Sequence, residues 1–279
     1  MSMNSFHARR QRPAPAAGKT PPAAGAARRA PRADQLLVER GLAPSRSAAR
    51  AWIEAGRVRA DGQPVAKPAQ ELAASAHIEI AADEADRYVS RGGLKLAGAL
   101  AASGLQPSGR HCLDIGQSTG GFSDCLLQAG AAKVVGVEVG HGQLHPRLRD
   151  EPRCITLEGL NARHLTAADL AGHYPADGFG LIVCDASFIS LSLLMPRWPA
   201  LLAREGDILT LVKPQFEVGQ QGIGKKGIVR DPRLYAELEH RLRALAQECG
   251  LAVSGWFDSP IAGGDGNHEF FLWMKHANH

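Results

Sequence analysis

Short apolar runs alternate with helical patterns over the last two thirds of the chain. The runs are rich in Val, Ile, Leu and Cys, and they predict seven strands, at 111–116, 133–139, 154–158, 180–185, 207–212, 251–257 and 268–275. Helices are expected in most of the gaps, most clearly over 232–249, where leucines recur at helical spacing. This alternation predicts an α/β domain with a mostly parallel sheet covered on both faces. A Gly-rich loop separates the last two strands, so we expect a terminal hairpin with an antiparallel last strand.

The pattern before residue 83 is different and predicts a small α+β domain over residues 32–82. A short helix around Leu36 is expected to stop at Gly41. A second helix is expected from Ser45, a favoured N-cap residue, to Gly56, a favoured C-cap residue. Two short strands follow, so this part of the chain can form a compact unit of its own.

The charge of the chain is unevenly distributed. Residues 1–60 contain 12 Lys and Arg but only 3 Asp and Glu, whereas the rest contains 20 basic and 25 acidic residues. Residues 1–31 are mostly Ala, Pro, Gly and Arg and are predicted to be a disordered basic arm. Residues 83–90 are interpreted as a linker and residues 91–279 as the large domain. The front of the chain is therefore expected to bind a polyanion.

Residues 112–122, CLDIGQSTGGF, predict a strand, a glycine turn and the start of a helix. The spacing of Gly116, Gly120 and Gly121 differs from the fingerprint of dinucleotide binders and suits a smaller cofactor with a carboxylate, such as S-adenosylmethionine. We expect a side chain at Gly120 to enter the path of that cofactor. The same residues match the serine-hydrolase elbow around Ser118, but such an elbow follows earlier strands of its sheet, whereas this strand is predicted to be the first. A turn without a ligand remains an alternative.

Charged side chains gather at the predicted carboxyl ends of the strands, where open α/β sheets bind ligands. The residues expected at this rim are Lys95, Asp114, Glu138, Asp185, Lys213 and Glu269. Glu138 could accept hydrogen bonds from a ribose diol. A lysine beside carboxylates could remove or orient the proton of a weakly acidic hydroxyl. Any one of these residues could instead be a simple ion-pair partner, but their convergence favours a catalytic role.

Several classes of protein are disfavoured by composition. No apolar run approaches the ~20 residues that a membrane span needs, and the N-terminus lacks the apolar core of a secretory signal. The five cysteines form no Cys-x-x-Cys pair, so we expect free thiols, a cytoplasmic location and no metal site. The sequence leaves the oligomeric state open.

Residues 32–68 resemble the S4 RNA-binding domain through R-x-DQLL, GL-x-x-SR-x-x-A and the following glycine turns. The resemblance and the clustered arginines imply an RNA-binding surface. The residues predicted to contribute to it are Arg46, Arg50, Arg57, Arg59 and Arg91. A solvated face of arginines with no partner is the plainer alternative.

The chain from about residue 32 to 275 resembles the TlyA (haemolysin A) family of S4-domain rRNA 2′-O-methyltransferases, whose catalytic domain is FtsJ-like. The matching strings are RYVSRGGLKL, LDIGQSTGGF, NAR, CDASFISL, LVKPQFE and SPIAGGDGNHEF. The resemblance implies a Rossmann-like methyltransferase fold, S-adenosylmethionine as cofactor and 2′-O-methylation of cytidine in 16S and/or 23S rRNA, with ribosomal subunits as partners.

The resemblance also implies site residues. The catalytic set corresponds to Lys95, Asp185, Lys213 and Glu269. The residues expected to bind the cofactor are Asp114, Gly116, Ser118, Thr119, Gly120, Gly121, Phe122, Glu138, Asn161 and Asp185. Two residues depart from the family pattern: Gln117, where a small residue is usual, and Glu138, where Asp is usual. Either departure could adjust the affinity for the cofactor.

Two other functions stay open from sequence. An S4-domain assembly factor with an inactive methyltransferase domain would bind RNA without modifying it, but all four catalytic residues are present. A membrane-lytic protein would fit the haemolysin name, but no amphipathic or membrane-spanning segment is identified.

Overall fold

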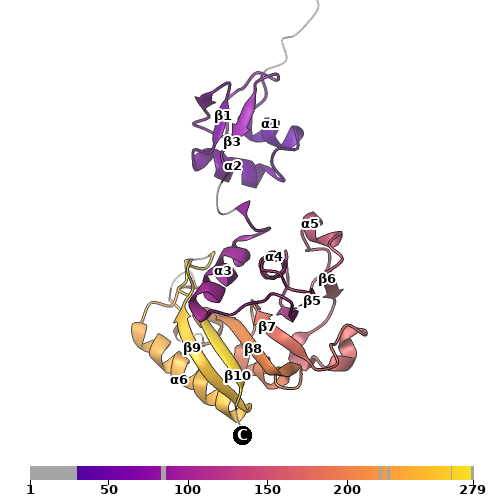
Figure 1. Cartoon of the computed structure of the whole chain (residues 1–279). Coiled ribbons are helices and arrows are strands. Elements are labelled where there is room, and N and C mark those ends of the chain that lie inside the picture. The colour runs from indigo at the N-terminus through magenta and orange to yellow at the C-terminus, as the bar shows by residue number, and fades with distance from the viewer. Residues whose placement is uncertain (1–29, 83–85, 220–221, 225–226, 265, 278–279) are drawn as a thin grey trace, which may run out of the picture. The chain divides into compact units, whose positions relative to one another are not determined.

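A computed structural model describes residues 30–82, 86–219, 222–224, 227–264 and 266–277 of the chain. They form two compact units, divided between residues 82 and 83 (Figure 1). The predicted arm lies outside the described residues except for residues 30 and 31, and residues 83–85 of the predicted linker also lie outside them.

The small unit packs two helices against a three-stranded antiparallel sheet of order β2-β1-β3. Its elements are α1 (Ala33–Glu39), α2 (Arg46–Glu54), β1 (Val58–Ala60), β2 (Gln63–Pro64) and β3 (Ile78–Ile80). The Ser45 hydroxyl accepts a hydrogen bond from the Ala48 N–H, so this residue caps α2 as the sequence predicts. Leu37, Ile53 and Val58 are fully buried at the centre of the unit.

The large unit is built on a seven-stranded sheet of order β6-β5-β4-β7-β8-β10-β9. Its strands are β4 (His111–Ile115), β5 (Lys133–Glu138), β6 (Cys154–Glu158), β7 (Phe179–Cys184), β8 (Leu202–Val212), β9 (Leu251–Asp258) and β10 (Phe270–His276). All neighbouring pairs among β4 to β8 are parallel, whereas β10 runs antiparallel to both β8 and β9. The predicted α/β fold with an antiparallel last strand is therefore confirmed.

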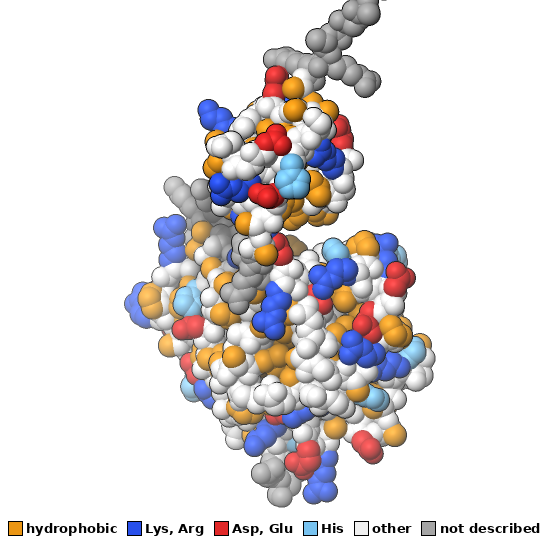
Figure 2. Space-filling view, turned by 45° about the horizontal axis from the view of Figure 1, so that its top comes forward, with side chains coloured by type: hydrophobic (Ala, Val, Ile, Leu, Met, Phe, Trp, Pro, Cys, Tyr) orange, Lys and Arg blue, Asp and Glu red, His pale blue; other side chains and the backbone are white. Residues whose placement is uncertain are grey.

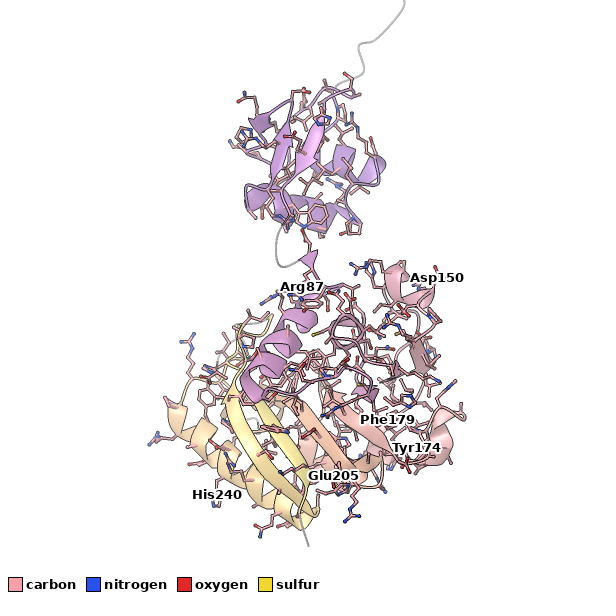
Figure 3. All side chains as sticks on the ribbon, in the orientation of Figure 1. Arg87, Asp150, Tyr174, Phe179, Glu205 and His240 are labelled. Atoms are coloured by element: carbon pink, nitrogen blue, oxygen red, sulfur yellow. The ribbon has the colours of Figure 1, made fainter. Side chains whose placement is uncertain are left out.

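Each face of this sheet has its own apolar core. On one face, α3 (Arg91–Ser103) and α4 (Gly121–Gln128) bury Leu96 and Leu126 against the sheet. On the other face, α6 (Pro232–Glu248) buries Leu238 and Leu242. Successive residues of β7 alternate between the two cores, as the two-residue period of a strand requires. Phe179, at the start of β7, packs edge-on against Tyr174 at the end of the sheet away from the strands' carboxyl ends (Figure 3).

The gaps around β7 differ from the prediction of helices. They contain only short 3₁₀ turns, Ala162–His164, Ala167–Leu170, Leu191–Leu193 and Met195–Arg197. Between β5 and β6 the helix α5 (Pro146–Arg149) has four residues. Pro146, Gly172, Pro175, Pro196 and Pro199 lie inside these gaps, and both residue types interrupt longer helices. The carboxyl ends of β4, β5 and β7 are therefore bordered by loops rather than covered by long helices.

Charged side chains of both signs are spread over the surface that Figure 2 shows. Among the described residues, no helix is both long and apolar enough to cross a membrane. The same part of the chain contains no group of three His, Cys, Asp or Glu side chains suited to holding a metal ion.

Candidate active site

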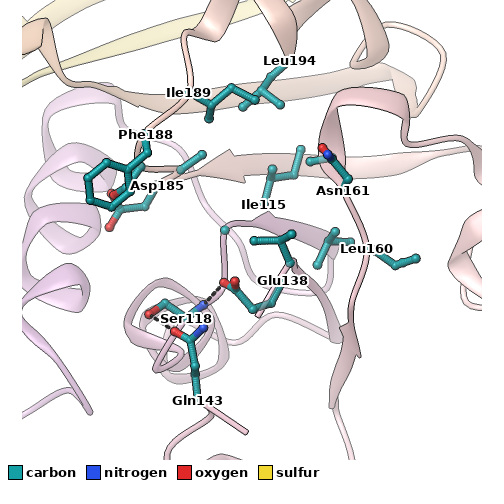
Figure 4. Close-up of a pocket in the computed structure, with 16 residues that line it drawn as sticks. Ile115, Ser118, Glu138, Gln143, Leu160, Asn161, Asp185, Phe188, Ile189 and Leu194 are labelled. Carbon is teal, nitrogen blue, oxygen red and sulfur yellow. Dashed lines mark hydrogen bonds between the residues drawn. The ribbon is translucent and has the colours of Figure 1, made fainter. Parts of the chain in front are cut away.

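A cavity of about 470 Å³ opens at the carboxyl ends of β4, β5 and β7 (Figure 4). Its wall is mostly apolar, with Val137, Leu160, Ile189 and Leu194 among the lining side chains. Its polar residues include three predicted to bind the cofactor: Glu138, Asn161 and Asp185. A mostly apolar cavity of this size with a few convergent polar groups is typical of a small-molecule site.

The glycine turn after β4 borders this cavity, but its glycines are required by the protein's own packing. Gly116, Gly120 and Gly121 would each bring a Cβ too close to neighbouring atoms: the Ala186 backbone, the Leu148 side chain and the Ser90 hydroxyl. Gly116 and Gly120 also have φ values of +81° and +90°. The expectation that a side chain at Gly120 would enter the cofactor's path is therefore wrong, because its Cβ points at Leu144 and Leu148.

Glu138 fixes the turn from the end of β5. Its two carboxylate oxygens accept hydrogen bonds from the backbone N–H groups of Ser118, at 2.9 Å, and Gly140, at 2.8 Å. Ser118 itself has a φ of +49°, and its hydroxyl contacts Gln143 at 3.1 Å. A carboxylate has about four acceptor positions. Glu138 can thus hold the turn and still accept hydrogen bonds from a ligand in the cavity.

A second, more polar cavity of about 190 Å³ adjoins the first, because both are lined by Gly116, Ser118, Asp185 and Ser187. Thr119, Gly121, Phe122 and Lys213 line it as well.

The Lys213 ammonium lies 2.7 Å from Asp185 Oδ1 and donates hydrogen bonds to the Ser187 hydroxyl at 2.8 Å and the Asp185 carbonyl at 3.3 Å. Only 11% of the Lys213 side chain and 23% of the Asp185 side chain are exposed. A charged pair therefore stands at the junction of the two cavities.

Lys95 and Glu269 form a second, more deeply buried pair. The Lys95 ammonium donates to Glu269 Oε2 at 2.5 Å, and both side chains are at least nine-tenths buried. Burial raises the pKa of the Glu269 carboxyl, whereas the charges of Lys95 and Lys213 oppose this rise. The structure therefore brings the four predicted catalytic residues together as two ion pairs whose charges act on one another.

Asp114 is fully buried and lines neither cavity. It accepts a hydrogen bond from the Ser123 hydroxyl at 2.7 Å, and the Gln117 amide donates to that same hydroxyl at 2.8 Å. Burial raises the pKa of Asp114 to about 7. Gln117 points into the core, where its amide fills the space above Gly136 of β5. Gln117 also lines the smaller cavity, but its amide and the Asp114 carboxyl are directed into the core, where they support the turn.

Asn161 lies between β6 and β7, and its side-chain oxygen accepts a hydrogen bond from the Arg163 N–H at 3.0 Å. Asn161 also lines the large cavity (Figure 4). Its side-chain amide carries an NH₂ group that can donate hydrogen bonds.

Phe188 is a residue at the cavity rim that sequence reasoning missed. Its side chain is 90% exposed, its φ is +62°, and its ring lies 5.1 Å from that of Phe216. A bulky residue in the left-handed region is a strained exception, and such strain is concentrated at functional sites. The signal in the sequence was its place in the CDASF string, three residues after Asp185.

The predicted RNA-binding arginines differ in their contacts. Arg46 forms a 3.0 Å ion pair with the buried Asp34, which Arg32 also contacts. Arg57 donates to the Ala81 carbonyl and lies over the Trp52 ring. Arg59 donates to the Gly62 carbonyl.

Arg50 is exposed on α2, and Arg91, at the start of α3, donates to the Ala262 carbonyl at 3.0 Å. Of the four predicted arginines in the small unit, Arg46 and Arg57 have the clearest structural roles.

Two protein families match the chain. The FtsJ-like methyltransferase family matches residues 88–276, and the S4 domain family matches residues 31–78.

The chain is also similar to named proteins along most of its length. It is 46% identical over 249 residues to the 16S/23S rRNA (cytidine-2′-O)-methyltransferase TlyA of Mycobacterium tuberculosis, which covers 89% of this chain and 91% of that protein. It is 36% identical over 239 residues to Hemolysin A of Brachyspira hyodysenteriae, covering 86% and 97%. A solved structure described as a hemolysin candidate from Streptococcus thermophilus is 36% identical, covers 90% of each chain and superimposes with a TM-score of 0.69.

Proposed function

Because the chain belongs to the TlyA family of FtsJ-like methyltransferases, we propose that it transfers a methyl group from S-adenosylmethionine to a ribose 2′-hydroxyl of ribosomal RNA. The proposed target nucleotide is a cytidine of 16S and/or 23S rRNA, as in the relative from M. tuberculosis. The observation that carries this proposal is the Lys213–Asp185 pair at the junction of the two cavities. Such an enzyme acts where ribosomal subunits are, so the proposal includes a cytoplasmic location.

The residues of the two cavities fit the proposed cofactor. The apolar wall of the larger cavity suits a nucleobase, and Glu138 and Asn161 offer an acceptor and a donor for ribose hydroxyls. The smaller cavity, with Thr119 and the start of α4, suits an amino-acid moiety. When bound, the sulfonium of the cofactor supplies an activated methyl group. The departure at Glu138 is compatible with this role, because its carboxylate borders the cavity.

The protein's own part in the reaction is alignment and removal of one proton. The Lys213 ammonium would hold the ribose oxygen by a hydrogen bond, and the Asp185 carboxylate would accept the hydroxyl proton. The oxygen would bond to the methyl carbon as the bond between that carbon and the sulfur of the cofactor breaks. The Lys95–Glu269 pair lies deeper and acts on the first pair through its charges. We propose that it keeps the Lys213–Asp185 pair in its charged arrangement.

The exposed ring of Phe188 is proposed to stack on the base of the target nucleotide. Single-stranded bases are commonly bound by aromatic side chains, and enzymes that modify a nucleotide take it out of its stack. The ring lies beside Asp185 at the cavity mouth (Figure 4). The S4-like unit would add affinity for the rRNA through its arginines.

The test is transfer of labelled methyl groups from S-adenosylmethionine to purified small subunits, large subunits and naked rRNA. The expected result is label on a cytidine 2′-oxygen in at least one of these substrates, absent for Lys213→Ala. RNA binding without any transfer by the unmodified protein would instead identify a binding factor and overturn the proposal.

A further inference from the structure

Glu217 is a buried carboxylate with no role in the steps described above. It follows the 3₁₀ turn Pro214–Phe216, four residues after Lys213, and is only 7% exposed. Burial raises the pKa of its carboxyl, although hydrogen bonds and Arg241 oppose the rise. Burying a carboxylate is unfavourable unless hydrogen bonds compensate for the lost water. The hydrogen-bond partners of Glu217 therefore show which part of the structure the side chain stabilises.

The partners of Glu217 lie at the end of the loop that follows β7. The Leu191 N–H donates to Oε1 at 2.7 Å, and the Ser190 hydroxyl donates to Oε2 at 2.8 Å. From the other side, Arg241 of α6 donates to the Glu217 carbonyl at 2.7 Å and lies 3.4 Å from Oε2. The carboxylate thus joins the segment after β8 to the segment after β7, with α6 as its support.

The loop held in this way carries the exposed, left-handed Phe188. Lys213 fixes the loop on one side of this residue by its 2.8 Å hydrogen bond to Ser187, and Glu217 fixes it on the other side at Ser190. The Phe216 ring rests against Phe188 in between. A strained, solvent-exposed conformation persists only where its surroundings over-determine it. The hydrogen bonds at Ser187 and Ser190 fix the loop on both sides of Phe188 and can maintain its strained conformation.

We infer that Glu217 is a positioning residue that holds the loop 185–190 so that the Phe188 ring stays at the cavity mouth, where it meets the target base. The effect on the loop follows from the contacts of Glu217 alone. The effect on catalysis rests on the proposed function. Glu217 touches neither the cofactor nor the reacting atoms in this scheme, and it acts through Phe188.

The loop itself is tested by amide hydrogen exchange of the full-length protein. Glu217→Ala removes both acceptors, and exchange across residues 186–193 should rise about tenfold or more, first at the Leu191 amide. Glu217→Gln keeps an acceptor for that amide and should stay near the wild-type rate. Glu237→Ala, which removes an exposed glutamate of α6, is the matched control and should leave the loop unchanged.

Activity tests whether Glu217 acts through Phe188. With saturating cofactor, Glu217→Ala and Phe188→Ala should each lower kcat/KM for the rRNA substrate about 10- to 100-fold. The double variant should be no worse than Phe188→Ala alone, because both changes remove the same contact.

Two results would overturn the inference: unchanged exchange at Leu191 in Glu217→Ala, or losses of activity that multiply in the double variant. An inactive wild-type protein would refute the proposed function, while the exchange experiment would still decide the role of Glu217.

Discussion

The pKa values of buried carboxylates are shifted in opposite directions in the two units of the chain. In the small unit Asp34 is fully buried, and its hydrogen bonds to Arg32 and Arg46 lower its pKa to about 2. In the large unit burial raises the pKa values of Asp114, Glu217 and Glu269. A lowered pKa means that the charged form of the carboxyl stabilises the folded state. A raised pKa means that the folded state disfavours the charged form, which lowers the free energy of unfolding when the group is ionised. The small unit thus gains stability from its buried charge, whereas the large unit buries these three carboxylates at a cost in stability.

The largest expected effect is a loss of methyl transfer by the large unit while its fold is retained. Lys213→Ala should lower kcat for methyl transfer about 10³-fold, because Asp185 and the ribose oxygen lose the ammonium that positions them. Proton transfer to a positioned side chain contributes effects of this order. Affinity for S-adenosylmethionine and the melting temperature should change little. Single-turnover methylation, calorimetry and thermal unfolding measure the three quantities.

Lys275→Ala, an exposed lysine on β10, is the control for loss of one positive charge. Changes at Lys95 and Glu269 should also impair turnover, and combined changes should not multiply, because the two pairs act as a unit. Turnover by Lys213→Ala near the wild-type rate at neutral pH would contradict the proton-handling role.

The response of the large unit to pH should follow Asp114. In the folded protein the Asp114 carboxyl keeps its proton up to about pH 7, whereas in the unfolded chain it loses the proton near pH 4. Folding is therefore accompanied by binding of a proton between these pH values. The contribution of this group to the free energy of unfolding should therefore fall, by a few kcal/mol, as the pH rises from about 4 to 7. In Asp114→Asn this part of the slope should disappear. Denaturant titrations of both proteins across that range provide the measurement, and identical slopes would exclude the assignment.

Gln117 and Gly136 form a complementary pair beside the glycine turn of the large unit, because the Gln117 side chain fills the space that the glycine leaves. A Cβ on Gly136 would lie 2.0 Å from the side-chain carbon Cδ of Gln117. Gly136→Ala should destabilise the protein by about 1–3 kcal/mol and weaken cofactor binding, as over-packing usually does. Adding Gln117→Ala should recover part of this loss, since it removes the clashing amide. A double variant less stable than Gly136→Ala would show that the two side chains do not share this space.

Asp34 should give the opposite pH response in the small unit. Its lowered pKa contributes stability that is complete above about pH 4 and is lost as the pH falls towards 2. Asp34→Asn should cost about 1–2 kcal/mol at neutral pH, allowing for the solvent exposure of the two arginines. Hydrogen exchange of α1 and α2 in the full chain reports on this unit, and the affinity for S-adenosylmethionine serves as the control. Faster exchange in the large unit alone would contradict the assignment.

The sequence predicted the fold well because the strand signal is local. Most strands of the large sheet are short apolar runs, and the observed β5 and β6 end within one residue of the predicted ends. The strand β8 instead begins at Leu202, five residues before the predicted start at residue 207. The polar residues at the strand ends could be placed for the same reason: a residue that follows a parallel strand must lie at the sheet's carboxyl edge.

Side-chain direction could not be predicted in this way. Gln117 lies in the glycine turn and Asp114 lies in β4 just before it, but both side chains point into the core. Gly136 leaves room there for the Gln117 amide, and Ser123 provides a partner for both. Phe188 looks like an ordinary core residue in the sequence, but its backbone is in the left-handed region and its ring is exposed. Both outcomes depend on contacts between segments far apart in the chain.

The smallest expected effect concerns the arginines of the small unit, where sequence reasoning treated structural and exposed residues alike. Arg46 holds Asp34 and Arg57 packs on Trp52, so replacing either would also disturb the fold. Arg50 is exposed on α2 and is the cleaner probe. If it contacts a phosphate of rRNA, Arg50→Ala should weaken binding uniformly and reduce the slope of log affinity against log salt concentration by about 1. Affinity for rRNA fragments at several salt concentrations measures this slope, with exchange of α2 confirming that the unit stays folded. Arg46→Ala should instead weaken binding and speed exchange together. An unchanged slope in Arg50→Ala would mean that this face of α2 does not meet RNA.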